Sequence, residues 1–196
     1  DNGAYKDLHM HTWTPNTGTI KDAWNDAMQS ISTCNQVYSI IEAAPSMTEA
    51  DRTRTLAEIR GIRAYWYYML VDNFGNVPLV TDFADTELPT TKSRKEVYDF
   101  VVSELNAIKD QLRSDVTGAS YGKFTKGAAY TLLAKMYLNA EVWTGAPNWQ
   151  GVVDACNEVM KLDYIIEPDW KQSFIVNNQN SKEIILPICF GRADGG

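Results

Sequence analysis

The sequence contains few cysteines, few histidines and no excess of positive charge. Its 196 residues include three Cys and two His, and 18 Lys and Arg stand against 25 Asp and Glu, which gives a formal net charge of −7. Cys34, Cys156 and Cys189 lie far apart and show neither a C-x-x-C pair nor a metal-ligand spacing. We therefore expect buried free thiols, no metal and no cofactor, and the lack of a basic stripe argues against a nucleic-acid partner.

Long hydrophobic runs are also missing. No segment reaches the ~18 apolar residues that a membrane-spanning helix needs, and Asp1 opens directly into polar sequence without a signal peptide. The chain stops at Gly-Arg-Ala-Asp-Gly-Gly just after a strand-like run. From both ends we expect a fragment or a processed form.

Aromatic residues, by contrast, are plentiful: ten Tyr, six Trp and six Phe. Such side chains suit cores, protein interfaces and sugar-binding surfaces alike, so their number alone selects none of these. The length and the ordinary share of hydrophobic residues, 44%, fit a single globular domain over residues 1–196.

Apolar residues recur every three or four positions in five segments, a spacing typical of helices. The predicted helices span about residues 21–43, 46–72, 93–112, 125–141 and 149–162. Residues 1–20 are expected to form a loop, and residues 183–190 a strand interrupted by Pro187. The fold class is therefore mostly α, with tetratricopeptide-like helical hairpins, a few short strands and long loops, although a strict 34-residue repeat is lacking.

Two helices begin with a recognisable cap. Ser46 stands three residues before Glu49, and Ser93 three residues before Glu96, the capping-box spacing in which side chains satisfy free backbone donors. After the first of these caps, residues 62–71 are apolar nearly all round the helix, which predicts an interior position.

The second helix also carries a family resemblance. Residues 58–80 read EIRGIRAYWYYMLVDNFGNVPLV. Without a gap, this resembles the signature of the SusD/RagB family, E-A-R-F-L-R-A-x-Y-Y-F-x-L-V-x-x-F-G-D-V-P-L-V. Two mild departures are Gly61 in place of an aromatic and Asn76 in place of Asp.

Further motifs follow in the order typical of that family. Residues 24–35 are similar to its W-x-x-x-Y-x-x-I-x-x-x-N helix, with Met28 in place of Tyr. Residues 121–138 are similar to its G-R-x-T-K-G-A-A-x-A-L-L-A-R-x-Y-L segment, and residues 183–186 to its E-I-I-F strand. The resemblance extends over about residues 12–190.

This resemblance implies four tetratricopeptide-like helical pairs and an irregular region that bears much of the ligand site. It also implies a lipoprotein on the cell surface, in the outer membrane of a Bacteroidetes-type bacterium. There it would bind an oligosaccharide, or another nutrient, for a SusC-like TonB-dependent transporter. Members of the family are longer, and their lipobox Cys, lipid anchor and carboxy-terminal half are not found in this sequence.

The candidate glycan-binding residues are Trp13 and Asn16, in a loop before the first long helix. A Trp face stacks on the apolar face of a sugar ring, and an Asn amide offers a donor and an acceptor to its hydroxyls. In the prototype of the family, a W-x-x-N loop at a similar place contacts glycan. The alternative, a Trp that packs over the first helix, stays equally open.

Other polar pairs are better explained as solvated surface residues than as catalytic groups. Asp22 and Asp26 lie four apart on one helix, whereas the carboxylates of glycoside hydrolases flank a bond from separate elements. With no nucleophile motif either, we expect no catalytic residue and no enzyme.

His9 and His11 lack the third ligand that a zinc site needs, so a solvated loop is expected there. For Arg60 and Arg63 we expect structural ion pairs with Glu58 or Asp72. The alternative function is a helical-repeat scaffold for protein–protein interaction.

Overall fold

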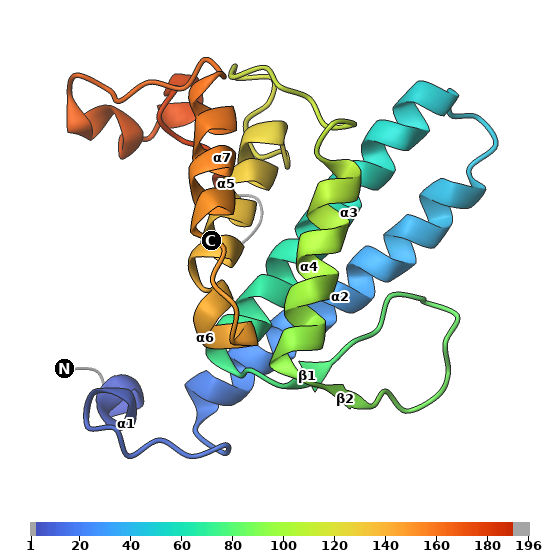
Figure 1. Ribbon diagram of the computed structural model, residues 1–196, viewed down its shortest axis with the longest axis vertical. Helices are drawn as coiled ribbons and strands as arrows, with labels where there is room; N and C mark the ends of the chain where they lie inside the picture. Colours follow the sequence, from blue (N-terminus) through green and yellow to red (C-terminus); the bar gives the residue numbers. More distant parts are fainter. Residues whose placement is uncertain (1–2, 190–196) are drawn as a thin grey trace.

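The computed structural model describes residues 3–189, and most of this chain is helical (Figure 1). Five longer helices carry the fold: α2 (Gly18–Ala43), α3 (Glu49–Asn73), α4 (Arg94–Ile108), α5 (Lys126–Leu138) and α7 (Trp149–Met160). The shorter elements are the helices α1 (Lys6–His9) and α6 (Ala140–Thr144), the 3-10 turns Gly3–Tyr5, Trp170–Ser173 and Asn178–Asn180, and the strands β1 (Val77–Pro78) and β2 (Thr91–Lys92). The predicted mostly-α class is confirmed.

The helices associate in neighbouring pairs, as the hairpin prediction requires. Helices α2 and α3 form a long hairpin, α4 packs along α3, and α5 packs against α7 (Figure 1). Strands β1 and β2 pair in antiparallel register, with Val77 opposite Lys92 and Pro78 opposite Thr91. This short ladder closes the long loop that leads from α3 to α4.

One of the two predicted capping boxes is present. At α4, the Ser93 hydroxyl accepts from Glu96 N, and the Glu96 carboxylate accepts from Ser93 N at 2.8 Å. At α3 the prediction was wrong, because Thr48 rather than Ser46 is the cap and accepts from Asp51 N at 3.2 Å. Since Glu49 is the first helical residue, its side chain cannot reach back as a third-position residue would.

Three predicted segments differ from the structure. Residues 3–9, predicted as a loop, form a 3-10 turn and then α1. The predicted helix 125–141 is divided at Asn139 into α5 and α6. Residues 183–189 form no strand; within residues 3–189 the only sheet is β1–β2, so this segment has no ladder to join. Its Ile185 and Leu186 pack against the helical core instead, and Phe190 lies outside the described residues.

Helix α3 is the centre of the core, but only along one face. Ala64, Tyr67, Leu70 and Val71 are fully buried between α2, α4 and α5. Ile62, in contrast, is 38% exposed. The prediction that residues 62–71 are buried all round is therefore confirmed for the inner face and wrong for the outer one.

Gly61 explains a departure from the family pattern. A Cβ built at this position would lie 2.2 Å from Cδ1 of Phe124, a ring that is almost completely buried. The aromatic that the family motif places at this point of α3 is replaced here by a ring from the segment before α5. The glycine leaves the room that this ring needs.

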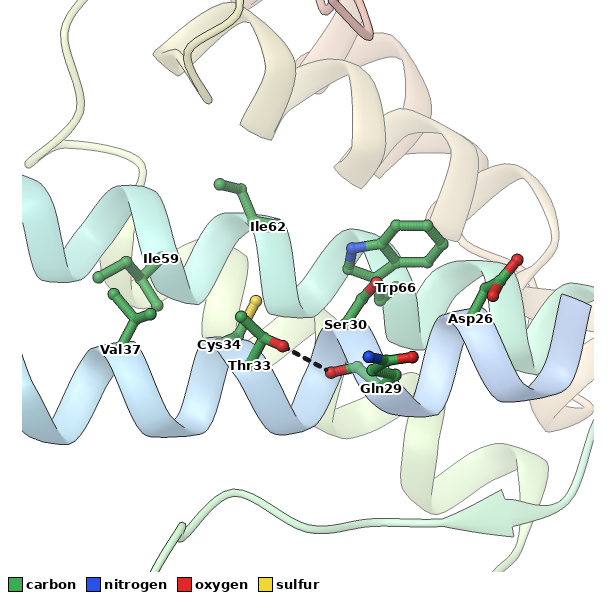
Figure 2. Close-up of a pocket in the computed structure, with 9 residues that line it drawn as sticks. All are labelled: Asp26, Gln29, Ser30, Thr33, Cys34, Val37, Ile59, Ile62 and Trp66. Carbon is green, nitrogen blue, oxygen red and sulfur yellow. Dashed lines mark hydrogen bonds between the residues drawn. The ribbon is translucent and has the colours of Figure 1, made fainter. Parts of the chain in front are cut away.

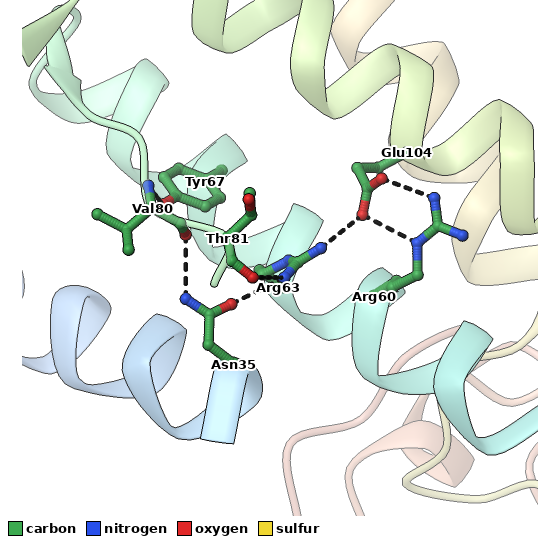
Figure 3. A network of polar contacts seen from close by, with 7 residues as sticks. All are labelled: Asn35, Arg60, Arg63, Tyr67, Val80, Thr81 and Glu104. Atoms are coloured by element: carbon green, nitrogen blue, oxygen red, sulfur yellow. Dashed lines mark hydrogen bonds and ion pairs between the residues drawn. The ribbon is translucent and has the colours of Figure 1, made fainter. Parts of the chain in front are cut away.

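The buried polar network of the inner face is centred on Arg63 (Figure 3). Its guanidinium donates to the Asn35 side-chain oxygen at 2.8 Å, to the Thr81 carbonyl at 2.9 Å and to the Glu104 carboxylate at 2.9 Å. Arg60 pairs with the same carboxylate through two hydrogen bonds, the shorter of 2.6 Å. Structural pairing of both arginines is confirmed, whereas the partners we expected, Glu58 and Asp72, are wrong, because α4 supplies the acid.

The network also fixes the chain that follows β1. The Tyr67 hydroxyl donates to the Val80 carbonyl at 2.9 Å and accepts from Val80 N at 2.7 Å, and the Asn35 amide donates to the same carbonyl at 3.0 Å. Burial raises the pKa of Glu104, but the hydrogen bonds from Arg60 and Arg63 outweigh it and hold that pKa below its usual value. The acid is therefore ionised at neutral pH and pairs with two cations.

The cysteine prediction holds for one residue of three. Cys34 is buried, and burial raises its pKa, whereas Cys156 and Cys189 are exposed. Two of the thiols thus lie on surfaces that the helices of this chain do not cover. Among the helices of the described chain, none is both long and apolar enough to cross a bilayer.

Candidate functional site

Trp13 lines a cavity at the end of the α2–α3 hairpin. The cavity has a volume of about 640 Å³. Its walls come from the loop before α2, the first turns of α2 and the last turn of α3: Trp13, Pro15, Ile20, Lys21, Ala23, Trp24, Met69, Asn73 and Phe74. Two segments far apart in the sequence, residues 13–24 and 69–74, therefore meet around one hollow, which we call the Trp13 cavity.

Local hydrogen bonds shape the loop that carries Trp13. The Thr17 hydroxyl accepts from Thr14 N at 2.9 Å, and Thr17 N donates to the Thr14 carbonyl at 2.9 Å. The Thr14 hydroxyl in turn accepts from Asn16 N at 3.2 Å. This turn places Trp13 over the start of α2, where its ring remains 52% exposed.

Asn16 occupies a different position from Trp13. Its side chain is exposed, but it does not belong to the cavity wall. The structure thus brings Trp13 into a cavity and leaves Asn16 beside it, on the solvent side of the same turn. The glycan-binding role of Trp13 and Asn16 stays a prediction.

The wall opposite Trp13 is built from packed aromatics. The Trp24 and Phe74 rings meet edge to face, with centroids 5.1 Å apart. The Lys21 ammonium and the Asn73 amide supply polar groups around this apolar floor, although the Asn73 amide nitrogen already donates to the Met69 carbonyl at 2.8 Å. Flat rings with a few polar groups at the rim suit a ligand that has both apolar faces and hydroxyls.

A second hollow, which sequence reasoning missed, runs between α2 and α3 (Figure 2). Its volume is about 650 Å³, and we call it the hairpin groove. Helix α2 supplies four polar residues together with Cys34 and Val37, whereas the three residues from α3 are apolar. Its lining residues are Asp26, Gln29, Ser30, Thr33, Cys34, Val37, Ile59, Ile62 and Trp66. The signal available in the sequence was the apolar circumference of α3, which exceeds what α2 and α4 can cover.

The polar pairs considered for catalysis and metal binding do not form a site. Asp22 and Asp26 are both exposed on one helix. His9 ends α1 and His11 has a left-handed backbone with φ of 54°, so the two do not alternate along a strand. Within residues 3–189, no three His, Cys, Asp or Glu side chains come together as metal ligands would.

The chain matches known proteins over most of its length. Residues 1–138 match the SusD-like family described as starch-binding and associating with the outer membrane. The starch-binding protein SusD of Bacteroides thetaiotaomicron is 32% identical over 82% of this chain and 29% of its own length. A SusD-like protein of Formosa agariphila is 24% identical over 89% of this chain and 33% of its own length. The chain thus spans about a third of these relatives.

Solved structures share the fold. A SusD superfamily protein from Parabacteroides distasonis superimposes with a TM-score of 0.86 over 96% of this chain and 41% of its own, at 24% identity. A laminarin-binding SusD-like protein gives a TM-score of 0.83 over 95% of this chain and 41% of its own, also at 24% identity. With its signature helix, its helical hairpins and a family match over residues 1–138 of 196, this chain belongs to the SusD-like family.

Proposed function

We propose that this chain is part of a cell-surface protein that binds an oligosaccharide and delivers it to a SusC-like TonB-dependent transporter. One observation carries the binding part of the proposal: in a chain of a starch-binding family, a loop Trp lines a cavity of about 640 Å³ floored by packed aromatics. The family description supports an outer-membrane location.

In this proposal, Trp13 stacks on a sugar ring and Asn16 hydrogen-bonds to hydroxyls at the rim. Trp13 is suited to stacking because half of its surface is free and it lines the cavity together with residues from the start of α2. The family description names a binding function and no reaction, which agrees with a non-enzymatic role. The proposal assigns no catalytic residue.

A scaffold for protein–protein interaction is the second candidate, because one surface favours it. Ile166, Trp170, Phe174 and Val176 are largely exposed in the segment that follows α7. Exposed apolar side chains of this size, close together in sequence, are typical of surfaces that another protein covers. This observation concerns a region far in sequence from Trp13, so the two functions can be tested separately.

The test compares two tryptophans of equal exposure. Trp13→Ala and Trp149→Ala each remove a ring that is 52% exposed, but Trp149 lies at the start of α7, outside the Trp13 cavity. In the complete protein, including any sequence beyond residues 1–196, a glycan array and calorimetry should show binding lost with Trp13→Ala and kept with Trp149→Ala. Asn16→Ala should weaken binding less, by about 0.5–1.5 kcal/mol per hydrogen bond.

The melting temperature decides between binding and packing. A loop Trp that serves a ligand makes few core contacts, whereas a core Trp truncated to Ala costs about 3–5 kcal/mol. If Trp13→Ala lowers the melting temperature strongly and leaves glycan affinity intact, Trp13 is a packing residue. The proposal would then lose its central residue.

A further inference from the structure

We infer that the hairpin groove extends the Trp13 cavity into one elongated site for a neutral oligosaccharide of several sugar units, with Trp66 as a second stacking platform. This inference rests on the proposed function, since it assumes that the Trp13 cavity holds sugar. It adds the length and the charge class of the ligand.

The two hollows lie in register along the same helix pair. On α3, the groove residues Ile62 and Trp66 are followed by the cavity residues Met69 and Asn73, at steps of four, three and four. Residues with this spacing share one face of a helix. The lining of α3 runs from residue 59 to residue 73, which is 14 steps of ~1.5 Å, or about 21 Å.

Helix α2 shows the matching stripe in the opposite direction. The cavity residue Ala23 is followed by the groove residues Asp26 and Ser30 at steps of three and four. Because α2 and α3 form a hairpin, the start of α2 lies beside the end of α3 (Figure 1). These ends line the cavity, and the middle parts of the two helices line the groove. The cavity and the groove therefore follow one another along a single face of the hairpin.

The edges of the groove have the chemistry that a sugar chain requires. Figure 2 shows the Trp66 indole over α2, with Ser30, Gln29 and Asp26 beside it. An indole face packs against the C–H face of a sugar ring, while an amide, a hydroxyl and a carboxylate bind its hydroxyls. Around Trp13, the polar groups of the lining are those of Lys21 and Asn73.

Charge favours a neutral ligand. Asp26 is the charged residue of the groove lining, and no ion pair within residues 3–189 involves it. A carboxylate without a cation accepts hydrogen bonds from hydroxyls but repels a uronate or a sulfate. Lys21, the charged residue of the cavity lining, lies five residues before Asp26 on α2, so the two linings together carry no net charge. The chain as a whole carries a net charge of −7.

The test measures how affinity depends on glycan length in the complete protein. The probes are malto-oligosaccharides and laminari-oligosaccharides, each as a disaccharide and as a hexasaccharide, followed by calorimetry. The hexasaccharide should bind more tightly than the disaccharide. Gln29→Ala and Trp66→Ala should each lower hexasaccharide affinity about tenfold, equivalent to ~1.4 kcal/mol, and leave disaccharide affinity unchanged. An oligogalacturonide of equal length should bind more weakly.

The matched control is Asp22→Ala, which removes an exposed carboxylate one turn before Asp26 on the same helix but outside both linings. It should leave both affinities unchanged. Because Trp66 is half-buried, its variant could disturb the fold, whereas Gln29 is exposed and keeps the test independent of stability.

The outcomes separate this inference from the proposed function. If the hexasaccharide and disaccharide bind equally, or if Gln29→Ala leaves hexasaccharide affinity intact, the elongated site is overturned and the Trp13 cavity stands. Trp66→Ala that lowers the melting temperature with unchanged affinity would make Trp66 a packing residue rather than a stacking platform, which also overturns it. If no glycan binds at all, the proposed function fails.

Discussion

The two faces of α3 differ in burial although both are apolar in sequence. On the inner face, Ala64 and Tyr67 are completely buried and Arg63 takes part in the polar network with Glu104. On the outer face, Ile62 is 38% exposed and Trp66 lines the hairpin groove. Hydrophobic character alone therefore does not show which residues are buried, because neighbouring elements decide which of them form the core of this chain.

The largest difference in stability is expected between two substitutions on opposite faces of α3, at positions two residues apart. Ala64→Glu places an unpaired carboxylate in the inner face and should cost several kcal/mol, enough to remove much of the ~5–15 kcal/mol that stabilises a typical domain. Ile62→Glu on the outer face should change stability by about 0.5 kcal/mol. Urea unfolding measures both free energies. Equal destabilisation by the two variants would mean that the outer face is core as well.

The next largest loss of stability is expected in the buried polar network centred on Arg63. Glu104→Gln leaves two guanidinium groups without their carboxylate, and breaking such a buried pair costs about 3–5 kcal/mol. The matched control, Asp99→Asn, removes an exposed acid from the same helix that pairs with Lys95 and should cost less than about 1 kcal/mol. A Glu104→Gln variant as stable as the wild type would show that the network contributes no net stability.

The dependence of stability on pH provides an independent measure of the ion pairs that Glu104 forms with Arg60 and Arg63. The folded pKa of Glu104 is lowered relative to the ordinary value of 4.5, so the folded state binds this proton less readily than the unfolded state. Its contribution to stability is therefore complete above pH 4.5 and is lost as pH falls through the lowered pKa. Urea unfolding at several pH values should show this loss in the wild type, and the loss should be smaller in Glu104→Gln.

A smaller effect is expected at Gly61. An added Cβ would lie within 3 Å of three atoms of the Phe124 ring, so Gly61→Ala should cost about 1–3 kcal/mol by overpacking. Gly18→Ala, at the first position of α2, meets no atom within 4 Å and serves as the control. Comparable melting temperatures for the two variants would contradict the close fit of the Phe124 ring against α3.

Helices could be predicted well because their evidence is local. The periodic stripes and the Ser93 cap depend on neighbours three or four residues apart, and the structure confirms them. Where the sequence offered two local choices, Ser46 and Thr48, the prediction took the wrong one. The predicted strand at residues 183–189 failed because a strand exists only with a partner, and periodicity does not report one.

The site could be predicted less well from the sequence, because it depends on contacts between segments that are far apart in the chain. Trp13 was singled out from a loop motif, but its cavity requires Phe74, more than sixty residues away, and Asn16 lies outside the wall. The partner of Arg63 was also misassigned, because the sequence shows acids near it on α3 and not Glu104 on α4. Likewise, the hairpin groove exists only where two helices meet.

The loop between β1 and β2 has a practical consequence. Its start is held by the bonds of Tyr67 to Val80 and of Arg63 to Thr81, and its two ends are joined by the β1–β2 ladder. Residues 81–90, however, are exposed throughout. Lengthening a loop whose ends are already fixed costs little, because closure entropy grows only with the logarithm of length. An epitope tag or a protease site could therefore be inserted near Leu88 while α3 and α4 stay packed.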